Sequence, residues 1–246
     1  MRRPPGWSRG STKPSRADAS SLAREITGLV GYVALFAALL FLGAGTWRWP
    51  RARVLLGVLF VLRAISLALL WPTRRELLAE RAKGPVQAGQ SSGDRLLLAG
   101  FMATYAALIA FSAADLWRLH LLPPLPTWVR VLGLAAFVVG TGIVHNALRA
   151  NAFAVTVVRV QEERGQLVVR EGPYGIVRHP MYAGIIPVMV GVAAWLGSAA
   201  GMIAAAIPTA ILCARIVLEE RMLRARLPGY ERYTREVRWR LVPGVW

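Results

Sequence analysis

The stretch TGLVGYVALFAALLFLGAGT, residues 27–46, is 20 residues long and contains no charged side chain. An α-helix rises 1.5 Å per residue, so a run of this length can cross the roughly 30 Å hydrocarbon core of a bilayer. Further apolar runs occupy about 54–71, 96–117, 127–148, 181–197 and 199–218. The last two are short and separated only by a Gly-Ser turn, as in a helical hairpin. The sequence therefore predicts an all-α, polytopic membrane bundle of about six spans.

Composition and charge agree with residence in a membrane. Hydrophobic residues make up 55% of the chain and charged residues 17%, whereas soluble domains are about one quarter charged. The formal net charge is +17, yet the Lys and Arg residues flank the apolar runs instead of forming one basic face. This pattern disfavours nucleic acid as a partner and favours anionic membrane lipids. The single cysteine, Cys213, excludes an internal disulfide.

The distribution of basic residues predicts the orientation. Of the 30 Lys and Arg residues, 24 fall in the N-terminal stretch, the second and fourth connections and the C-terminal stretch, and five fall on the other side. Because cytoplasmic loops are enriched in Lys and Arg, we expect both termini in the cytoplasm. The prevalence of Arg over Lys is typical of bacteria with GC-rich genomes, so the membrane would be a bacterial inner membrane.

The N-terminal part divides into two predicted regions. Residues 1–26 are basic and rich in Ser, Pro and Gly, which predicts a disordered tail, and residues 27–148 form a four-span region. A signal peptide is the alternative interpretation of the start. However, Trp47-Arg48-Trp49 follows the first run without a small-residue cleavage site, so a retained helix with an aromatic interface belt fits better.

The segment GPYGIVRHPMYAG, residues 172–184, lies where a long loop meets the fifth run. Pro180 is suited to the first position of a helix, which places His179 at the helix N-terminus. Free backbone N–H groups and the helix dipole favour an anion there, such as the carboxylate of an amino-acid-like cofactor. Tyr174 and Tyr182 offer ring faces and hydroxyls. An ordinary interfacial turn is the alternative, because His, Arg and Tyr are common at the headgroup level.

The segment RIVLEER, residues 215–221, places two adjacent carboxylates at the end of the last run. Charges at that position are costly and usually functional. Arg215 and Glu219 are four residues apart and share a helix face, while Glu220 points about 100° away. Glu219 could accept hydrogen bonds from a cofactor ammonium group or ribose hydroxyls, and Arg215 could hold an anionic substrate group. A helix-end ion pair is the simpler alternative.

Two polar segments surround these motifs. Residues 157–170, VVRVQEERGQLVVR, predict a strand or extended segment at the membrane surface. After residue 218 the chain is polar but periodic, which predicts an amphipathic cytoplasmic helix that lies on the membrane or covers the site. The apolar positions of that helix are Met222, Leu223, Leu227, Tyr230 and Tyr233.

Weaker indicators lie inside the apolar runs. Arg63 occurs in the middle of the second run, where it either reaches the interface or lines a cavity. Gly140 and Gly142 suggest close helix packing. His145-Asn146 could face the site, although a hydrogen bond between helices is the more common use of such residues.

Three strings in this order, GPYGIVRHPMYAG, RIVLEERML and PGYERYTREVRWRLVPGVW, resemble the isoprenylcysteine carboxyl methyltransferase family. Membrane phospholipid methyltransferases are its wider relatives. The resemblance covers about residues 146–246, and the first four spans match only in hydropathy. It implies a helical membrane bundle in which residues 149–246, with two short spans and a cytoplasmic C-terminal segment, form the region that binds S-adenosylmethionine.

The resemblance also implies roles for individual residues. It assigns Arg215 to the substrate carboxylate, as the catalytic residue. Gln166 departs from the eukaryotic members, which have His at this position. The implied cofactor contacts are Gln161, Gln166, Leu167, Val168, Val169, Tyr174, His179, Pro180, Met181, Tyr182 and Glu219.

The implied chemistry is in-line methyl transfer to a lipophilic acceptor, most simply carboxyl O-methylation of the isoprenylcysteine type. A carboxylate is already ionised near neutral pH, so catalysis would depend on positioning and on removal of water. Three alternatives are an N-methyltransferase acting on phospholipids or other amines, an NADPH-dependent membrane reductase, and a non-enzymatic membrane protein. The enzymatic interpretations require His179 and Glu219 to line one cavity.

Overall fold

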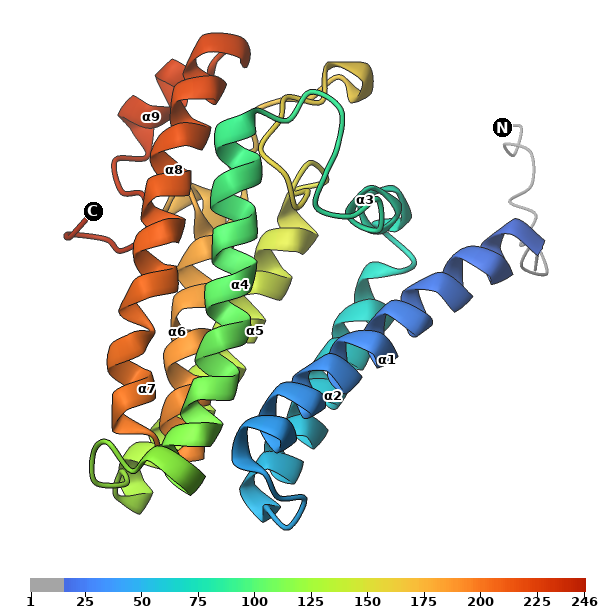
Figure 1. Ribbon diagram of the computed structural model, residues 1–246. Coiled ribbons are helices and arrows are strands. Elements are labelled where there is room, and N and C mark those ends of the chain that lie inside the picture. The colour runs from blue at the N-terminus through green and yellow to red at the C-terminus, as the bar shows by residue number, and fades with distance from the viewer. Residues whose placement is uncertain (1–15) are drawn as a thin grey trace, which may run out of the picture.

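The computed structural model describes the backbone of residues 16–246 and side chains from residue 20 onward. Within that part of the chain the regular elements are helices, and no strand occurs (Figure 1). The segment 157–170 accordingly contains irregular chain and one 3₁₀ turn, not a strand. The α-helices are α1 (Arg16–Ala44), α2 (Pro50–Leu70), α3 (Arg75–Arg81), α4 (Ser92–Ala114), α5 (Thr127–Ala150), α6 (Pro180–Leu196), α7 (Ala199–Ala204), α8 (Ala206–Arg226) and α9 (Tyr230–Glu236).

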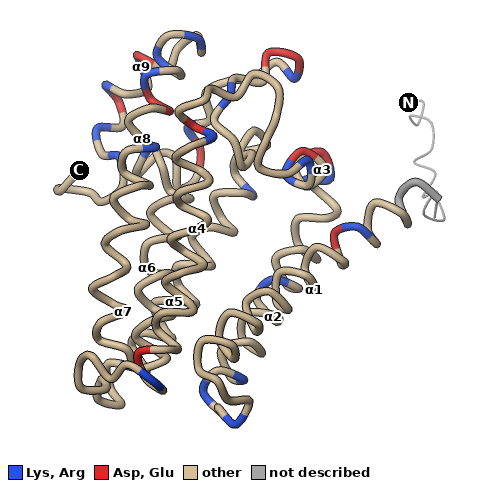
Figure 2. Tube along the Cα trace, in the orientation of Figure 1, with Lys and Arg blue, Asp and Glu red and all other residues tan. Residues whose placement is uncertain are grey.

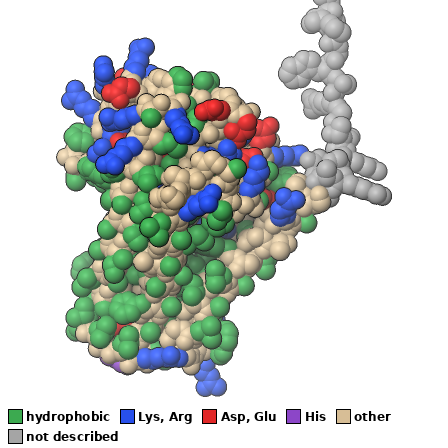
Figure 3. All heavy atoms as spheres, turned by 45° about the horizontal axis from the view of Figure 1, so that its top comes forward, with side chains coloured by type: hydrophobic (Ala, Val, Ile, Leu, Met, Phe, Trp, Pro, Cys, Tyr) green, Lys and Arg blue, Asp and Glu red, His purple; other side chains and the backbone are tan. Residues whose placement is uncertain are grey.

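The apolar helices confirm a polytopic membrane bundle. Every predicted run is helical, and α6 is a shorter apolar helix of 17 residues. Figure 3 shows hydrophobic side chains over the body of the visible face, most of the charged ones gathered at one end and a few basic ones at the opposite end. The protein is therefore an integral membrane protein. Five segments are long and apolar enough to span a bilayer: Ser20–Ala44, Pro50–Leu70, Ser92–Leu119, Thr127–Ala150 and Ala199–Arg226.

Two predicted boundaries differ from the structure. Helix α1 begins at Arg16, so residues 16–26 are helical instead of part of a disordered tail, and the start of that tail lies outside the described residues. Ala, Leu, Arg and Glu are good helix formers and extend the helix before the apolar run. At the other end, the predicted C-terminal amphipathic segment is helical but divided in two, because α8 continues to Arg226 and α9 is a separate helix. Pro228 and Gly229 end α8 and redirect the chain, and Gly229 does so with a φ of +83°.

The turn between α6 and α7 confirms the predicted hairpin. Gly197 ends α6 with φ +106°, a conformation that glycine adopts without strain. Ser198 then caps α7 by accepting a hydrogen bond from the Gly201 N–H at 2.8 Å. Its hydroxyl also donates to the buried carboxylate of Asp115 at 2.6 Å, which ties the hairpin to the end of α4.

Helices α5 and α6 pack antiparallel with their backbones in close approach. Gly133 of α5 faces Gly191 of α6, and Gly140 of α5 faces Gly184 of α6. Within each helix the two glycines are seven residues, or two helical turns, apart. A Cβ atom at Gly140 would lie 2.6 Å from the Gly184 carbonyl oxygen. Small residues allow this contact in membrane bundles. The packing predicted for Gly140 is confirmed, whereas Gly142 has nothing within 4 Å of its Cβ position.

The α1–α2 hairpin lies to one side of the other helices (Figure 1). The buried core that joins it to the bundle includes Phe36 and Leu40 of α1, Leu55 and Leu59 of α2, and Phe137 of α5. This core lies toward the α1–α2 turn. In Figure 2, charged residues concentrate at the end of the bundle that carries α3 and α9, which we call the loop-rich end.

The glycine contact generates a first prediction. Replacing Gly140 with Ala should lower the thermal unfolding temperature in detergent, because the new Cβ forces the α5 and α6 backbones apart. Overpacking of this kind costs about 1–3 kcal/mol, or roughly 2–10 °C in a chain of this size. Gly142→Ala on the same helix is the control and should unfold at the wild-type temperature or slightly above it. Equal loss in both variants would contradict the proposed packing.

Candidate functional site

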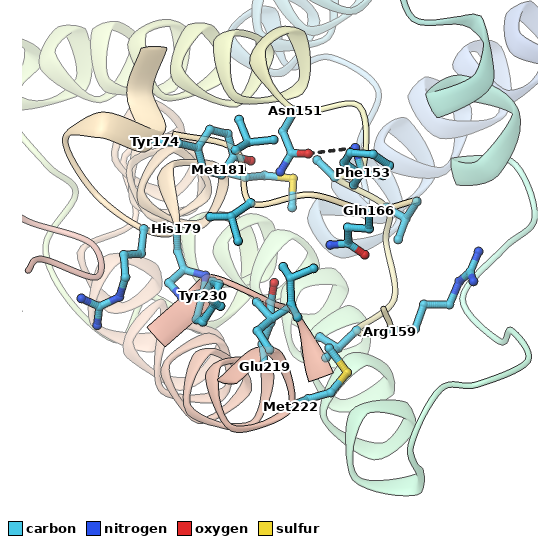
Figure 4. Close-up of a pocket in the computed structure, with 18 of the residues that line it drawn as sticks. Asn151, Phe153, Arg159, Gln166, Tyr174, His179, Met181, Glu219, Met222 and Tyr230 are labelled. Atoms are coloured by element: carbon cyan, nitrogen blue, oxygen red, sulfur yellow. Dashed lines mark hydrogen bonds between the residues drawn. The ribbon is translucent and has the colours of Figure 1, made fainter. Parts of the chain in front are cut away.

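A cavity of about 90 Å³ lies at the loop-rich end, between the α5–α6 loop, the start of α6, the end of α8 and α9 (Figure 4). Its wall combines apolar side chains, tyrosines and one carboxylate. His179 and Glu219 both line it, as the enzymatic interpretations require. Other lining residues include Asn151, Phe153, Val155, Val157, Gln166, Tyr174, Met181, Tyr182, Met222, Leu223, Leu227 and Tyr230.

His179 occupies the position predicted for it, immediately before Pro180 at the start of α6. Its imidazole stacks on the Tyr182 ring, with centroids 5.7 Å apart and an interplanar angle of 10°. Its Nε2 lies 3.2 Å from a Glu220 carboxylate oxygen. The ring is therefore fixed from two sides and has little rotational freedom.

Glu220 is the centre of a buried ionic cluster behind His179. Only 3% of it is exposed. Its carboxylate accepts hydrogen bonds from Arg178 Nε at 2.6 Å and from Arg240 Nε at 3.0 Å. Arg178 also donates to the carbonyl oxygens of Val237 and Arg238, each at 2.7 Å. The cluster thereby joins α8, the turn before α6 and the C-terminal stretch into one wall.

Glu219, one residue earlier on α8, faces the cavity instead. Its Oε2 accepts a hydrogen bond from the Tyr182 hydroxyl at 2.7 Å. It is the only carboxylate among the residues that line the cavity. Because one helical residue turns the side-chain direction by about 100°, the two adjacent acids point to different surroundings. Sequence analysis recognised the pair but gave Glu220 no role.

Arg215 lies behind the cavity wall, not in it. The side chain is buried, and its Nε donates to Asp94 Oδ1 at 2.7 Å. Its Nη2 donates to the Thr156 carbonyl at 2.6 Å, and the guanidinium carbon lies 5.9 Å from the Tyr182 ring centroid. The arrangement does not support direct contact with a substrate carboxylate; Arg215 positions the wall.

Asp94 completes this second buried ionic contact and was missed from sequence. It is fully buried at the start of α4, and its Oδ2 accepts from the Val158 N–H at 2.9 Å and from Gln90 Nε2 at 2.7 Å. The pattern Ser91-x-x-Asp94 is a recognisable helix start, and Ser91 does cap α4. Its pairing with Arg215, 121 residues away, leaves no local signal.

Two of the implied cofactor contacts do not line the cavity. Gln161 is buried in the loop, where its Nε2 donates to the Phe153 carbonyl at 2.8 Å and its backbone N–H donates to Gln166 Oε1 at 2.8 Å. Pro180 is the first residue of α6 and positions the residues around it. The others do line it: Gln166, Leu167, Val168, Val169, Tyr174, His179, Met181, Tyr182 and Glu219.

The phenols from the loop and α9 remain protonated. Burial raises the pKa of Tyr174 to about 12, and burial also raises the pKa values of Tyr230 and Tyr233. The Tyr233 hydroxyl donates to the Tyr174 carbonyl oxygen at 2.7 Å, which fixes α9 against the 3₁₀ turn. Neutral tyrosines present ring faces and hydroxyl groups without adding negative charge to that of Glu219.

Helix α3 also holds the cavity-forming loop in place. Arg81 Nη1 donates to the Ala154 carbonyl at 2.7 Å, and Arg159 pairs with Glu80 at 3.2 Å. Helix α3 was not predicted from the sequence, because seven residues give too short a pattern to distinguish from a loop.

The Arg215–Asp94 pair generates a second prediction. Replacing Arg215 with Leu should destabilise the protein by roughly 3–5 kcal/mol, because a buried carboxylate loses its partner. The double variant Arg215→Leu, Asp94→Leu should recover part of that loss, as thermal unfolding in detergent would measure. Arg221→Leu, an exposed position on the same helix, is the control. A wild-type unfolding temperature for Arg215→Leu would contradict the positioning role.

Residues 128–227 match the model of a protein family. No curated protein matches the chain. The matched segment contains α5 to α8, including the α6 start and Glu219, but not α1 to α4. Residues 128–227 are similar to the phospholipid methyltransferase family, which belongs to the wider group of membrane methyltransferases.

Proposed function

We propose that this protein transfers a methyl group from S-adenosylmethionine to a lipophilic acceptor in the membrane. The observation that carries the proposal is the cavity in which His179, Tyr182 and Glu219 meet at one end of a membrane bundle. The similarity of residues 128–227 to phospholipid methyltransferases supports it independently of the geometry. We further propose that the loop-rich end, which carries most of the basic residues, faces the cytoplasm of a bacterium.

The chemistry of the cavity wall fits this cofactor. Glu219 offers a carboxylate to a cationic sulfonium or ammonium group, and the faces of Tyr174 and Tyr182 favour a cation. The first backbone N–H groups of α6 lack helical partners and suit a carboxylate. Val157, Leu223 and Leu227 supply apolar surface for an adenine ring. We assign Gln166 and the segment 167–169 to the opposite wall of the cofactor site.

When bound, S-adenosylmethionine would supply an electrophilic methyl group to a lone pair of the acceptor, and the electron pair of the broken C–S bond would stay on sulfur. The protein's contribution is positioning. Glu220 holds His179 in one orientation, and Tyr182 donates its hydroxyl hydrogen to Glu219. The apolar side chains exclude water from the nucleophile.

Two acceptor classes fit the site. Carboxyl O-methylation of the isoprenylcysteine type follows from the sequence resemblance, but Arg215 is engaged by Asp94 and is not among the lining residues. N-methylation of a phospholipid or other amine is the second candidate, favoured by the matched family. For this reaction Glu219, the single carboxylate in the wall, is the group placed to accept the proton that an ammonium nucleophile must lose.

Cofactor binding provides the third prediction. Isothermal titration in detergent should show binding of S-adenosylmethionine and none of NADPH, which also separates a methyltransferase from a membrane reductase. Glu219→Gln should weaken binding at least tenfold, because the cation loses its carboxylate partner. The control Glu231→Gln removes an exposed acid on α9 that does not line the cavity. Absence of binding to the wild type would refute the enzymatic proposal.

The pH dependence of methyl transfer provides the fourth prediction and separates the acceptor classes. With an amine acceptor, the rate at saturating cofactor should rise with pH, because more of the acceptor is deprotonated as pH approaches the amine pKa of roughly 10. With a carboxylate acceptor, the rate should be level above about pH 6, since the carboxylate is already ionised. Radiolabelled cofactor and a membrane lipid extract, followed by identification of the labelled product, provide the assay.

A further inference from the structure

A second cavity, of about 260 Å³, lies at the loop-rich end and shares no lining residue with the cavity that contains Glu219. It forms where α2 gives way to α3 and where the α5–α6 loop lies against that junction. Arg74, Arg75 and Arg164 line it, together with the single carboxylate of Glu76. The cavity therefore carries an excess of positive charge, for which methyl transfer provides no reason.

Two of these arginines are held in place by backbone carbonyl groups near the end of α5. Arg74 donates to the Arg149 carbonyl oxygen, through Nε at 2.9 Å and through Nη2 at 2.6 Å. Nη1 of Arg164 donates to the Ala152 carbonyl oxygen at 3.2 Å and to Gln161 Oε1 at 2.6 Å. The two side chains thus reach the same turn of backbone from α3 and from the loop, and both residues line the cavity between these elements.

The carboxylates nearby do not balance this charge. Glu76 Oε2 lies 3.6 Å from Arg164 Nη2, but 90% of the Glu76 side chain is exposed, against 15% for Arg164. Glu80 also lies within electrostatic range of Arg164, although its carboxylate is bonded to two other basic side chains. Arg74 forms no ion pair with a carboxylate among the residues that the structure describes. Neutral carbonyl groups therefore fix the arginines without cancelling their charge.

The cavity lies at the level where α2 leaves the apolar part of the membrane. The span ends at Leu70, and the side chain of Leu69 is 56% exposed. Trp71 follows, and the Arg75 guanidinium carbon lies 5.2 Å from its ring centroid, an arrangement typical of the membrane interface. Pro72 comes next and is the first lining residue. An anion in the cavity would therefore lie at the level of the lipid head groups.

We propose that this cavity binds the phosphate group of a membrane phospholipid. The planar guanidinium group suits phosphate oxygens, and basic pockets beside membrane helices hold anionic lipid head groups. Arg74 and Arg164 contact the phosphate, and the Thr73 hydroxyl is a further donor in the same wall. The acyl chains lie along the exposed apolar end of α2. The inference does not depend on the proposed function, because the two cavities are formed by different residues.

Lipid binding to the purified full chain in dodecyl maltoside tests the site. Phosphatidylglycerol, diacylglycerol with the same acyl chains and inorganic phosphate would be titrated separately, with binding measured by native mass spectrometry. We expect phosphatidylglycerol to bind about tenfold or more tightly than diacylglycerol, which lacks the phosphate group. It should also bind more tightly than inorganic phosphate, which lacks the chains. Diacylglycerol binding of equal strength would overturn the site, and inorganic phosphate binding of equal strength would overturn its assignment to a lipid.

Substitution of the two fixed arginines localises the binding. Arg74→Gln and Arg164→Gln should each weaken phosphatidylglycerol binding about tenfold, because each removes a charged donor to the phosphate. Arg226→Gln removes the same charge from an exposed position at the end of α8 that does not line the cavity, and should bind like the wild type. An equal loss in all three variants would indicate attraction to a general basic surface and would overturn the site.

Glu76→Gln tests the site in the opposite direction and at an exposed position. Removing the one carboxylate of the cavity should strengthen phosphatidylglycerol binding by roughly twofold to fivefold, the size of an exposed charge interaction. Unchanged or weaker binding would overturn the inference, and this test stands even if the arginine variants fail to fold. Binding that falls in Glu219→Gln but not in the arginine variants would place the lipid in the other cavity and overturn it as well.

Discussion

The candidate site depends on the compensation of two carboxylates that are buried behind its walls, because an uncompensated buried charge is costly. Asp94 is paired with Arg215 and Glu220 with Arg178, and each pair joins elements that are far apart in the chain. Helix α8 supplies one member of both pairs. It therefore acts as the fixed support to which α4, the cavity-forming loop and the turn before α6 attach. Removing Arg215 would leave the charge of Asp94 uncompensated, and removing Arg178 would take away one of the two arginines bonded to Glu220, so the walls are held by electrostatics as well as by packing.

Close packing of α5 and α6 sets the position of the remaining wall. Because glycines allow the two backbones to touch, α6 has little freedom to slide or rotate, and its first turn is presented at a fixed height. His179 lies at that first turn and Glu219 at the end of α8, so two independent constraints determine their separation. A positioning mechanism of methyl transfer needs this kind of rigidity.

Sequence reasoning found the parts of the structure that local patterns encode. Run length gave the spans, the Gly-Ser turn gave the hairpin, and Pro180 placed His179 at a helix start. It failed where a contact joins distant segments. The family resemblance assigned Arg215 to a substrate carboxylate, and its contact with Asp94 was missed because Asp94 is 121 residues earlier and no periodicity links the two. The adjacent acids show the same limit: a helical wheel separates their directions by about 100° but does not say which one meets His179.

Pairing with a buried carboxylate fixes the role of the two buried arginines behind the cavity wall. Arg178 and Arg215 have their charges neutralised within the protein, and a substrate could compete for them only by displacing a buried carboxylate. The two structural pairs can therefore stay intact through a catalytic cycle, because a ligand in the cavity has no need to break either of them.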